Sequence, residues 1–443
     1  MEKTSSVGTV APVATVDAER KRSIRKVVIS AGVGNFIEWY DLAIYAYAAA
    51  GIGHTLFPSK GDEGVALVMT MAVFGVTYLL RPISGVIIGV IGDKVGRKKL
   101  LVMTITLMAL ATLGIGLIPD YAVIGILAPI LLIVCRAVQG ISAGGEFIGA
   151  ATYVYENALP GRRGATVALI QLGTGMAYPA AAFFGFGLAN WMGDAVFLDW
   201  GWRILFLLAA PLGFVAWFIR RRLDESPEFI AIREAGETSK RPLSESLKDD
   251  PIRLLLAILF ISGYSIGAVS ILFYLPSYVS AIAGFDSGTA ALAMGCATLV
   301  FALAIPMWGP FVDKVGHGRA RIIVSVLMLI VIVPSYWLIL QGSIALLALG
   351  LGVLAISLAM YYASAPLAAV ELFPARLRYT SGTIAYNIPI AVMFAVFPTV
   401  AAALVVSLDS PIAPAILTAG GFALGVIGAI GLSVKASTRN IPS

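Results

Sequence analysis

The sequence contains few charged residues for its length. Of its 443 residues only 13% are Asp, Glu, Lys or Arg, whereas 59% are hydrophobic. Soluble domains carry about 25% charged residues, so a soluble fold of this composition would lack the polar side chains needed to cover its surface. The excess apolar surface must face lipid, which excludes a row of soluble domains and indicates a helical membrane protein.

Cysteine and histidine are scarce as well. Cys135 and Cys296 lie far apart in apolar runs, which excludes a disulfide framework and favours small packing residues. His54 and His317 lie near predicted loops, so we expect no metal site and no prosthetic group. The apolar run that begins at Val27 is too long for the core of a signal peptide and is better interpreted as a first membrane span.

Apolar segments of spanning length divide the chain. A spanning helix needs about 20 mostly apolar residues, and twelve segments meet this requirement: 27–50, 64–91, 100–118, 122–155, 164–190, 202–219, 253–282, 288–311, 320–340, 343–369, 379–406 and 412–434. We predict an all-α membrane protein of two pseudo-symmetric six-helix bundles. The predicted parts are an N-terminal tail (1–26), a first bundle (27–219), a connection (220–252), a second bundle (253–435) and a C-terminal tail (436–443). In the connection we expect Arg220, Arg221 and Arg222 at the membrane surface, followed by a short amphipathic helix with Ser226 as its cap and Pro227 in its first turn.

The positive charges predict the orientation. Twelve spans place both termini on one side, and 27 of the 31 Lys and Arg residues fall in the tails and loops of that side. Only Lys60 and Arg203 fall on the other side, while Arg81 and Arg136 lie inside spans. Because positive residues stay in the cytoplasm, we expect cytoplasmic termini in the inner cell membrane. This distribution also argues against nucleic acid as a partner.

Two sequence patterns occur in both halves. GVIGDKVGRKK begins at Gly89 and GPFVDKVGHGR at Gly309, while ENALPGRR begins at Glu156 and ELFPARLR at Glu371. Two matches in the same order indicate a duplicated six-helix unit, which is a known transporter architecture. The patterns predict the following gating residues: Gly89, Asp93, Gly96, Arg97, Glu156, Arg162, Gly309, Asp313, Gly316, Glu371 and Arg376.

The aspartate of the GxxxDKVG motif has a predicted task. Asp93 can accept hydrogen bonds from a helix N-terminus or an arginine of a neighbouring span, and this contact must break when that face opens. The alternative is a solvated charged turn. In the second copy His317 replaces Arg97, with Arg319 nearby, so we expect the second contact to be weaker.

Ionisable residues inside spans cost roughly 2.5–3.5 kcal/mol each on insertion scales and therefore need a function or a partner. On a helix, Asn35, Glu38, Asp41 and Tyr45 fall within about 120° of one another. Other candidates share the first half: Arg81, Arg136, Gln139 and Glu146. The functional hypothesis is a proton and substrate site, in which a conformational change alters the pairing of a carboxylate with an arginine. The alternative is a structural ion-pair network, or, for Arg81, a cap on neighbouring carbonyls.

The second half has few membrane-embedded charges, so its candidates are phenols and an amide. We assign Tyr274, Tyr278, Tyr362 and Asn387 to substrate binding, together with Asn35, Tyr45, Arg81, Arg136 and Gln139. Tyrosines are also common at membrane interfaces, and that alternative stays open for each of them.

Several of these stretches together resemble a known family. GNFIEWYD, RPISGVIIGVIGDKVGRKK, RAVQGISAGGE, DWGWRI, LDESPEF and ELFPARLRYTSG are similar to the metabolite:proton symporters of the major facilitator superfamily. That family includes transporters for proline and betaine, α-ketoglutarate, shikimate and citrate. The resemblance extends from about Arg25 to Lys435, and the combination of EWYD, GGE and DWGWRI is more specific than the duplicated motif.

The resemblance implies proton-driven uptake of a small polar metabolite through a cavity between the halves, with the proton as the only coupling ion. It implies proton coupling by Glu38, Asp41, Arg136 and Glu146, substrate or coupling contacts by Arg81, and gating by Asp93 and Arg97. Osmosensing relatives often carry a long C-terminal coiled coil, which this sequence lacks, so we favour a carboxylate over proline or betaine. DWGWRI and the AYN of the eleventh span are closer to the osmolyte branch.

We therefore predict a monomeric symporter for a small organic metabolite. The alternatives are an osmolyte symporter, an exporter or antiporter, and a channel. A membrane-embedded enzyme with Glu38 and Asp41 as an acid/base pair is disfavoured, because the sequence carries no cofactor or metal motif.

Overall fold

The computed structural model describes residues 13–57, 63–237 and 239–438. Twelve helical segments of this described chain are long and apolar enough to cross a membrane, which confirms the predicted class. The spanning helices of the first half are α1 (Val13–Leu56), α2 (Glu63–Val95), α3 (Arg97–Leu117), α5 (Leu127–Asn157), α6 (Arg163–Met192) and α8 (Trp202–Arg221). The second half spans with α11 (Pro251–Gly267), η2 (Ala268–Tyr274) and α12 (Leu275–Ala281) as one segment, then α13 (Ser287–Val315), α14 (His317–Ile339), α15 (Ile344–Glu371), α16 (Arg378–Leu408) and α17 (Ala413–Thr438).

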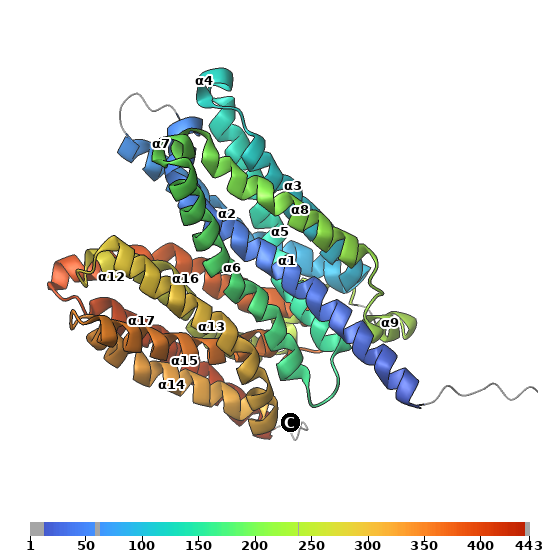
Figure 1. The fold of residues 1–443 in the computed structure, drawn as a ribbon. Coiled ribbons are helices and arrows are strands. Elements are labelled where there is room, and N and C mark those ends of the chain that lie inside the picture. The colour runs from blue at the N-terminus through green and yellow to red at the C-terminus, as the bar shows by residue number, and fades with distance from the viewer. Residues whose placement is uncertain (1–12, 58–62, 238, 439–443) are drawn as a thin grey trace, which may run out of the picture.

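The spans form two bundles. Figure 1 shows the blue-to-green helices α1–α8 grouped together and the yellow-to-red helices α11–α17 grouped beside them. The main contacts between the bundles join α6 to α13 and α2 to α16. Short helices lie between the spans: α4 (Tyr121–Ile124), α7 (Asp194–Val196) and the π-helical η1 (Phe197–Gly201).

The apolar side chains that the composition places against lipid form strips along the outside of the spanning helices. On α2, Leu79, Ile83 and Ile87 are 67%, 63% and 54% exposed. Because residues four apart share one face of a helix, these side chains make a continuous apolar strip. Cys296 is also exposed, so the prediction that both cysteines pack in the interior is wrong for this one.

The duplicated motif is mostly helical, whereas the sequence suggested a loop. Gly89 to Val95 forms the end of α2, and a single residue, Gly96, separates α2 from α3. Gly96 has φ 109° and Gly316, at the equivalent break between α13 and α14, has φ 91°. Only glycine adopts this backbone readily. We call the end of the molecule that contains Gly96 and Gly316 the motif end, and the opposite end the distal end.

The connection between the bundles contains two helices, of which the sequence predicted one. Ser226 caps α9 (Pro227–Glu234) by accepting a hydrogen bond from the Phe229 N–H at 3.3 Å, as its Ser-Pro start predicted. The second helix is α10 (Pro242–Asp249). Asp250 then accepts from the Arg253 N–H at 3.0 Å and from Lys435 Nζ at 2.5 Å. Burial opposes ionisation of Asp250, but these hydrogen bonds outweigh it and lower its pKa.

Candidate substrate site and gate

A buried ion pair joins α1 and α2 of the first bundle. Arg81 of α2 donates through Nη2 to Glu38 Oε1 of α1, and both side chains are 1% exposed. The Trp39 and Tyr78 rings lie 5.7 and 5.6 Å from the guanidinium carbon. Arg81 Nε and Nη1 and Glu38 Oε2 have no hydrogen-bond partner within the described chain. Buried polar atoms are normally satisfied, so this pair retains capacity to bind a further polar group.

Tyrosines of both bundles surround this pair. Tyr264 of α11 accepts a hydrogen bond from Gln171 Nε2 at 3.2 Å, and its hydroxyl lies 3.2 Å from that of Tyr386 of α16. The Tyr264 and Tyr362 ring centroids are 4.4 Å apart. The phenols of Tyr178, Tyr264 and Tyr386 lie within electrostatic range of Arg81. We define the central cluster as Glu38, Trp39, Tyr78, Arg81, Gln171, Tyr178, Tyr264, Tyr362 and Tyr386.

Asn35 reaches the central cluster through α6. Its amide nitrogen donates to the Ile170 carbonyl at 3.1 Å and to Gln171 Oε1 at 3.4 Å. Gln171 and Tyr264 are central residues that the sequence analysis missed. Each lies in a mostly apolar span, where a large polar side chain was the available signal.

A second ion pair lies entirely within the first bundle. Arg136 Nη1 donates to Asp41 Oδ2 at 3.0 Å. Asp41 Oδ1 accepts from Thr112 Oγ1 and Gln139 Nε2, both at 2.8 Å. The Arg136 guanidinium stacks 3.6 Å from the Tyr45 ring centroid. The predicted grouping of Asp41, Arg136, Gln139 and Tyr45 is therefore present, and both oxygens of Asp41 are satisfied.

Glu146 belongs to neither of these pairs, although the sequence analysis grouped it with Arg81 and Arg136. It pairs with Arg220 of α8 at 2.5 Å and accepts from Thr104. Arg220 was assigned to the membrane surface because it opens a run of three arginines, but it is 1% exposed. The helix α8 ends at Arg221, two residues beyond its predicted end, so Arg220 is still helical and its side chain turns into the bundle.

Gly34→Ala is expected to destabilise the protein. A Cβ at Gly34 would lie 1.8 Å from Arg220 Nη2 and 2.9 Å from Glu146 Oε1. The Arg220 guanidinium must then move, and we expect it to part from Glu146 at a cost of up to about 3–5 kcal/mol, that of a broken buried ion pair. The measurement is thermal unfolding of the purified protein. Gly75→Ala of α2 is the matched control, since a Cβ there meets nothing within 4 Å; equal melting temperatures for the two variants would contradict this account.

Three predicted substrate residues of the second half, Tyr274, Tyr278 and Asn387, lie outside the central cluster. Tyr278 donates to the Pro411 carbonyl at 2.7 Å, and its ring is 6.1 Å from that of Tyr274, toward the distal end of the second bundle. Asn387 donates to the Gly144 carbonyl at 2.7 Å. Its amide therefore joins α16 to α5 across the two bundles.

The first copy of the motif joins the two bundles. Asp93 Oδ2 accepts from the Thr380 N–H at 2.9 Å and from Thr380 Oγ1 at 2.7 Å, at the N-terminus of α16. Added Cβ atoms would lie 2.7 Å from Thr383 Oγ1 at Gly89 and 2.6 Å from the Tyr379 ring at Gly92. The glycines thus permit close approach of α2 and α16, and a carboxylate at a helix N-terminus is electrostatically favourable.

An ion-pair network surrounds this contact. Arg97 Nη2 lies 3.2 Å from Glu156 Oε1 and 2.9 Å from the Ala375 carbonyl of the second bundle. Arg378 donates to Glu156 Oε1 at 3.0 Å and to Glu228 Oε2 of α9 at 2.5 Å. Glu156 also accepts from Ser226. Glu156 therefore connects both bundles with the connecting segment.

The second copy makes the equivalent contact. Asp313 accepts from the backbone N–H groups of Gly164 and Ala165 at 2.7 and 2.8 Å, at the N-terminus of α6. Glu371 pairs with His317 at 2.5 Å and with Arg321. The sequence analysis found no arginine here to match Arg97 and pointed to Arg319. The structure supplies Arg321, one helical turn beyond His317, because α14 begins directly after Gly316.

Two predicted gating arginines, Arg162 and Arg376, lie outside the ion-pair network around Glu156. Arg162 is exposed, and Arg163 instead pairs with Glu228 at 3.4 Å. Arg376 pairs at 3.5 Å with Asp249 of α10, while Arg378 enters the gate. Arg163 and Arg378 are the first residues of α6 and α16, so the helix start, which the motif spacing does not reveal, decides which arginine turns inward.

Aromatic rings join the bundles on the distal side of the central cluster. The Tyr78 and Phe394 rings stack at 4.7 Å, and Phe273 of η2 lies 5.7 Å from Tyr178 and 5.1 Å from Phe394.

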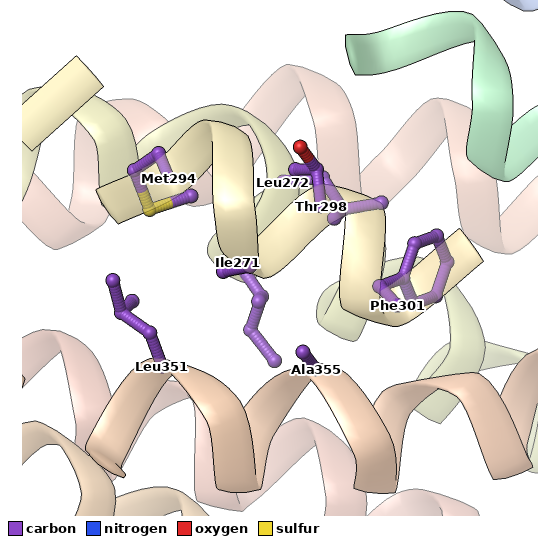
Figure 2. A pocket seen from close by; sticks show the side chains of 8 residues that line it. Ile271, Leu272, Met294, Thr298, Phe301, Leu351 and Ala355 are labelled. Carbon is purple, nitrogen blue, oxygen red and sulfur yellow. The ribbon is translucent and has the colours of Figure 1, made fainter. Parts of the chain in front are cut away.

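A separate cavity of about 10 Å³ lies within the second bundle between Ile271, Met294 and Leu351 (Figure 2). Its lining is apolar apart from Thr298, so it is not the candidate substrate site.

A buried charged cluster between two six-helix bundles, held by a duplicated contact at one end and by aromatic rings on the other side, defines a membrane transporter rather than an enzyme. The comparison with known families agrees, since the model described as Major Facilitator Superfamily matches residues 31–398. The chain belongs to this superfamily.

The chain also resembles individual curated transporters. The chain is 34% identical to the glycine betaine/proline/ectoine/pipecolic acid transporter OusA of Dickeya dadantii and 32% identical to the proline/betaine transporter of Escherichia coli strain K12. Each alignment covers 92% of this chain and 82% of the relative. The resemblance found in the sequence is thereby confirmed.

Solved structures share the fold. The proton:xylose symporter XylE bound to 6-bromo-6-deoxy-D-glucose superposes with a TM-score of 0.77 at 16% identity, over 96% of this chain and 97% of that structure. At this level of identity the likeness concerns the fold alone.

Proposed function

We propose that the protein imports a small zwitterion, of the proline or betaine type, together with protons. The observation that carries the proposal is the central cluster, in which one arginine is surrounded by aromatic side chains from both bundles. A guanidinium binds a carboxylate, and tyrosine and tryptophan faces bind a quaternary or secondary ammonium group. A zwitterion has both groups, whereas citrate or α-ketoglutarate would bring several negative charges to a single arginine. The relatives named for proline and betaine support the same substrate class.

The orientation is part of the proposal. The loops at the motif end carry most of the positive charge, so we place this end in the cytoplasm and the distal end outside the cell's inner membrane. Each bundle supplies part of the central cluster within one chain, and a monomer is therefore sufficient for transport. The proton gradient supplies the energy, with no prosthetic group.

The test is uptake into right-side-out membrane vesicles or proteoliposomes. Labelled betaine and proline are expected to accumulate above equilibrium when the outside is acid, and a protonophore is expected to abolish this accumulation. Labelled α-ketoglutarate and citrate are measured in parallel, because a carboxylate substrate was the expectation from the sequence. Vesicles without the protein give the background.

Two outcomes would contradict symport. Accumulation that an inside-acid gradient drives, or that a counter-substrate drives without a proton gradient, would make the protein an exporter or antiporter on the same fold. Uptake that neither saturates nor depends on the proton gradient would make it a channel.

A further inference from the structure

Two of the buried ion pairs of the first bundle, Glu38–Arg81 and Asp41–Arg136, differ in the spare hydrogen-bonding capacity of their carboxylates. Both oxygens of Asp41 accept hydrogen bonds, all of them from residues of the first bundle. Glu38 uses only Oε1, and its Oε2 has no hydrogen-bond partner within the described residues. The same holds for Nε and Nη1 of Arg81. Arg81 therefore has donors that its contact with Glu38 does not use, and a ligand bound to them would lie beside Glu38.

We propose that the carboxylate of the transported zwitterion binds the spare donors of Arg81, and that this forces Glu38 to take up the proton that is transported with it. The inference rests on the proposed function, because it requires a substrate with a carboxylate. It assigns the coupled proton to Glu38 and makes the substrate itself the trigger for protonation.

The reason is charge balance in a buried site. The empty pair is neutral, with one guanidinium and one carboxylate. A second carboxylate on the same guanidinium places two like charges within a few ångströms, and two such carboxylates do not both stay ionised in a low dielectric. One of them must be protonated.

The proton goes to Glu38 because the substrate carboxylate is the stronger acid, since its own cationic nitrogen stabilises the ionised form. A proton from the outer solution forms an O–H bond at Oε2, the free oxygen, while Oε1 keeps its contact with Arg81. When the substrate leaves on the other side, that O–H bond breaks and the proton passes to water there. One zwitterion and one proton cross in each cycle, so the cycle carries one positive charge inward.

Among the described residues, no other charged group is placed to take up this proton instead of Glu38. The titratable groups around it are Tyr78 and Arg81 from α2, Tyr178 from α6, Tyr264 from α11, Tyr362 from α15 and Tyr386 from α16. From α5, Arg136 is paired with Asp41 and Glu146 is paired with Arg220 of α8. Among the described residues, Glu38 is thus the carboxylate that faces the central cluster.

The test measures how ligand affinity depends on pH. If binding takes up one proton, the Kd of betaine rises about tenfold per pH unit wherever free Glu38 is ionised. In the E38Q variant the Kd is expected to be the same at every pH, and betaine accumulation in an acid-outside gradient is expected to be lost. E237Q is the matched control, because Glu237 is exposed on the connection, and it should keep the pH dependence of the unmodified protein.

A second measurement does not depend on the folding of a variant. Betaine is added to the unmodified purified protein in weak buffer with a pH indicator, and about one proton should be taken up for each betaine bound. Choline, which has the ammonium group but no carboxylate, should cause no proton uptake.

Two results would overturn the inference: an unchanged pH dependence of Kd in E38Q, or betaine binding without proton uptake. Failure of betaine, proline, α-ketoglutarate and citrate to bind would also overturn it, since no carboxylate would then reach Arg81. If only the proposed function fails, the result is different: the purified protein would still take up protons when the ligand binds, but vesicles would not accumulate the ligand.

Discussion

Asp41→Asn and Arg136→Ala are both expected to abolish proton-driven accumulation of substrate while the protein still inserts into the membrane. Asp41 is buried and takes hydrogen bonds from three side chains of the first bundle. Asparagine keeps the shape of the side chain but removes its charge, so the Arg136 cation loses its counter-ion. An uncompensated buried charge costs about 3–5 kcal/mol, enough to change which conformations the first bundle can adopt. The twelve apolar spans that direct insertion are unchanged.

The measurement is uptake into vesicles under an acid-outside gradient, normalised to the amount of protein in the membrane. Asp199→Asn is a suitable control, because Asp199 pairs with His54 at the exposed distal surface. Accumulation at the unmodified level in both Asp41→Asn and Arg136→Ala would refute the coupling role of this pair. The pH dependence of ligand binding separates the two ion pairs, because it is expected to survive in Asp41→Asn and to disappear in E38Q.

Asp93→Ala is expected to shift the protein toward the state that is open at the motif end. The variant loses two hydrogen bonds to a charged acceptor, from Thr380 N–H and Oγ1. Such bonds contribute about 1.5–3 kcal/mol each, so the ratio of closed to open molecules should fall by at least about tenfold. Asp313→Ala should act in the same direction, and we expect the smaller effect there, as the comparison of the two motif copies predicted.

The opening can be measured as a distance between spin labels on Lys94→Cys of α2 and Lys314→Cys of α13, after Cys135 and Cys296 are replaced by serine. Lys94 and Lys314 are both exposed at the motif end, one on each bundle. A longer distance is expected in Asp93→Ala than in the labelled parent. Unchanged distance distributions in both aspartate variants would show that these contacts do not hold the motif end closed.

The spanning helices could be predicted from the sequence, because each of them depends on local composition. All twelve predicted segments overlap spanning helices, and the Ser-Pro start of α9 was found from its capping pattern. The single-residue break at Gly96 was missed, because a motif rich in charge resembles a loop even when its hydrogen bonds stay helical. α10 was missed because its apolar residues are few.

The partners of the buried charges were harder to predict. Local spacing shows that Glu38 and Glu146 lie inside the membrane, but pairing with Arg81 or Arg220 depends on which helices pack together. Arg220 was the clearest failure, since a run of three arginines gives no sign that the first one turns inward. The central tyrosines Tyr264 and Tyr386 converge from distant spans, and single positions in apolar runs do not reveal that convergence.

The one-glycine joints at Gly96 and Gly316 link the gate to the surrounding bilayer. The helix after each joint presents a lipid-facing strip, Met103, Leu110 and Leu117 on α3 and Ile323, Ile330 and Trp337 on α14. Each residue of the first strip is 220 positions before its counterpart in the second, the same offset that relates the two motif copies. Only one residue separates α3 from α2 and α14 from α13, so a tilt of α3 or α14 is expected to shift Asp93 or Asp313. We therefore expect a change in bilayer thickness that tilts either helix to alter how readily the motif end opens.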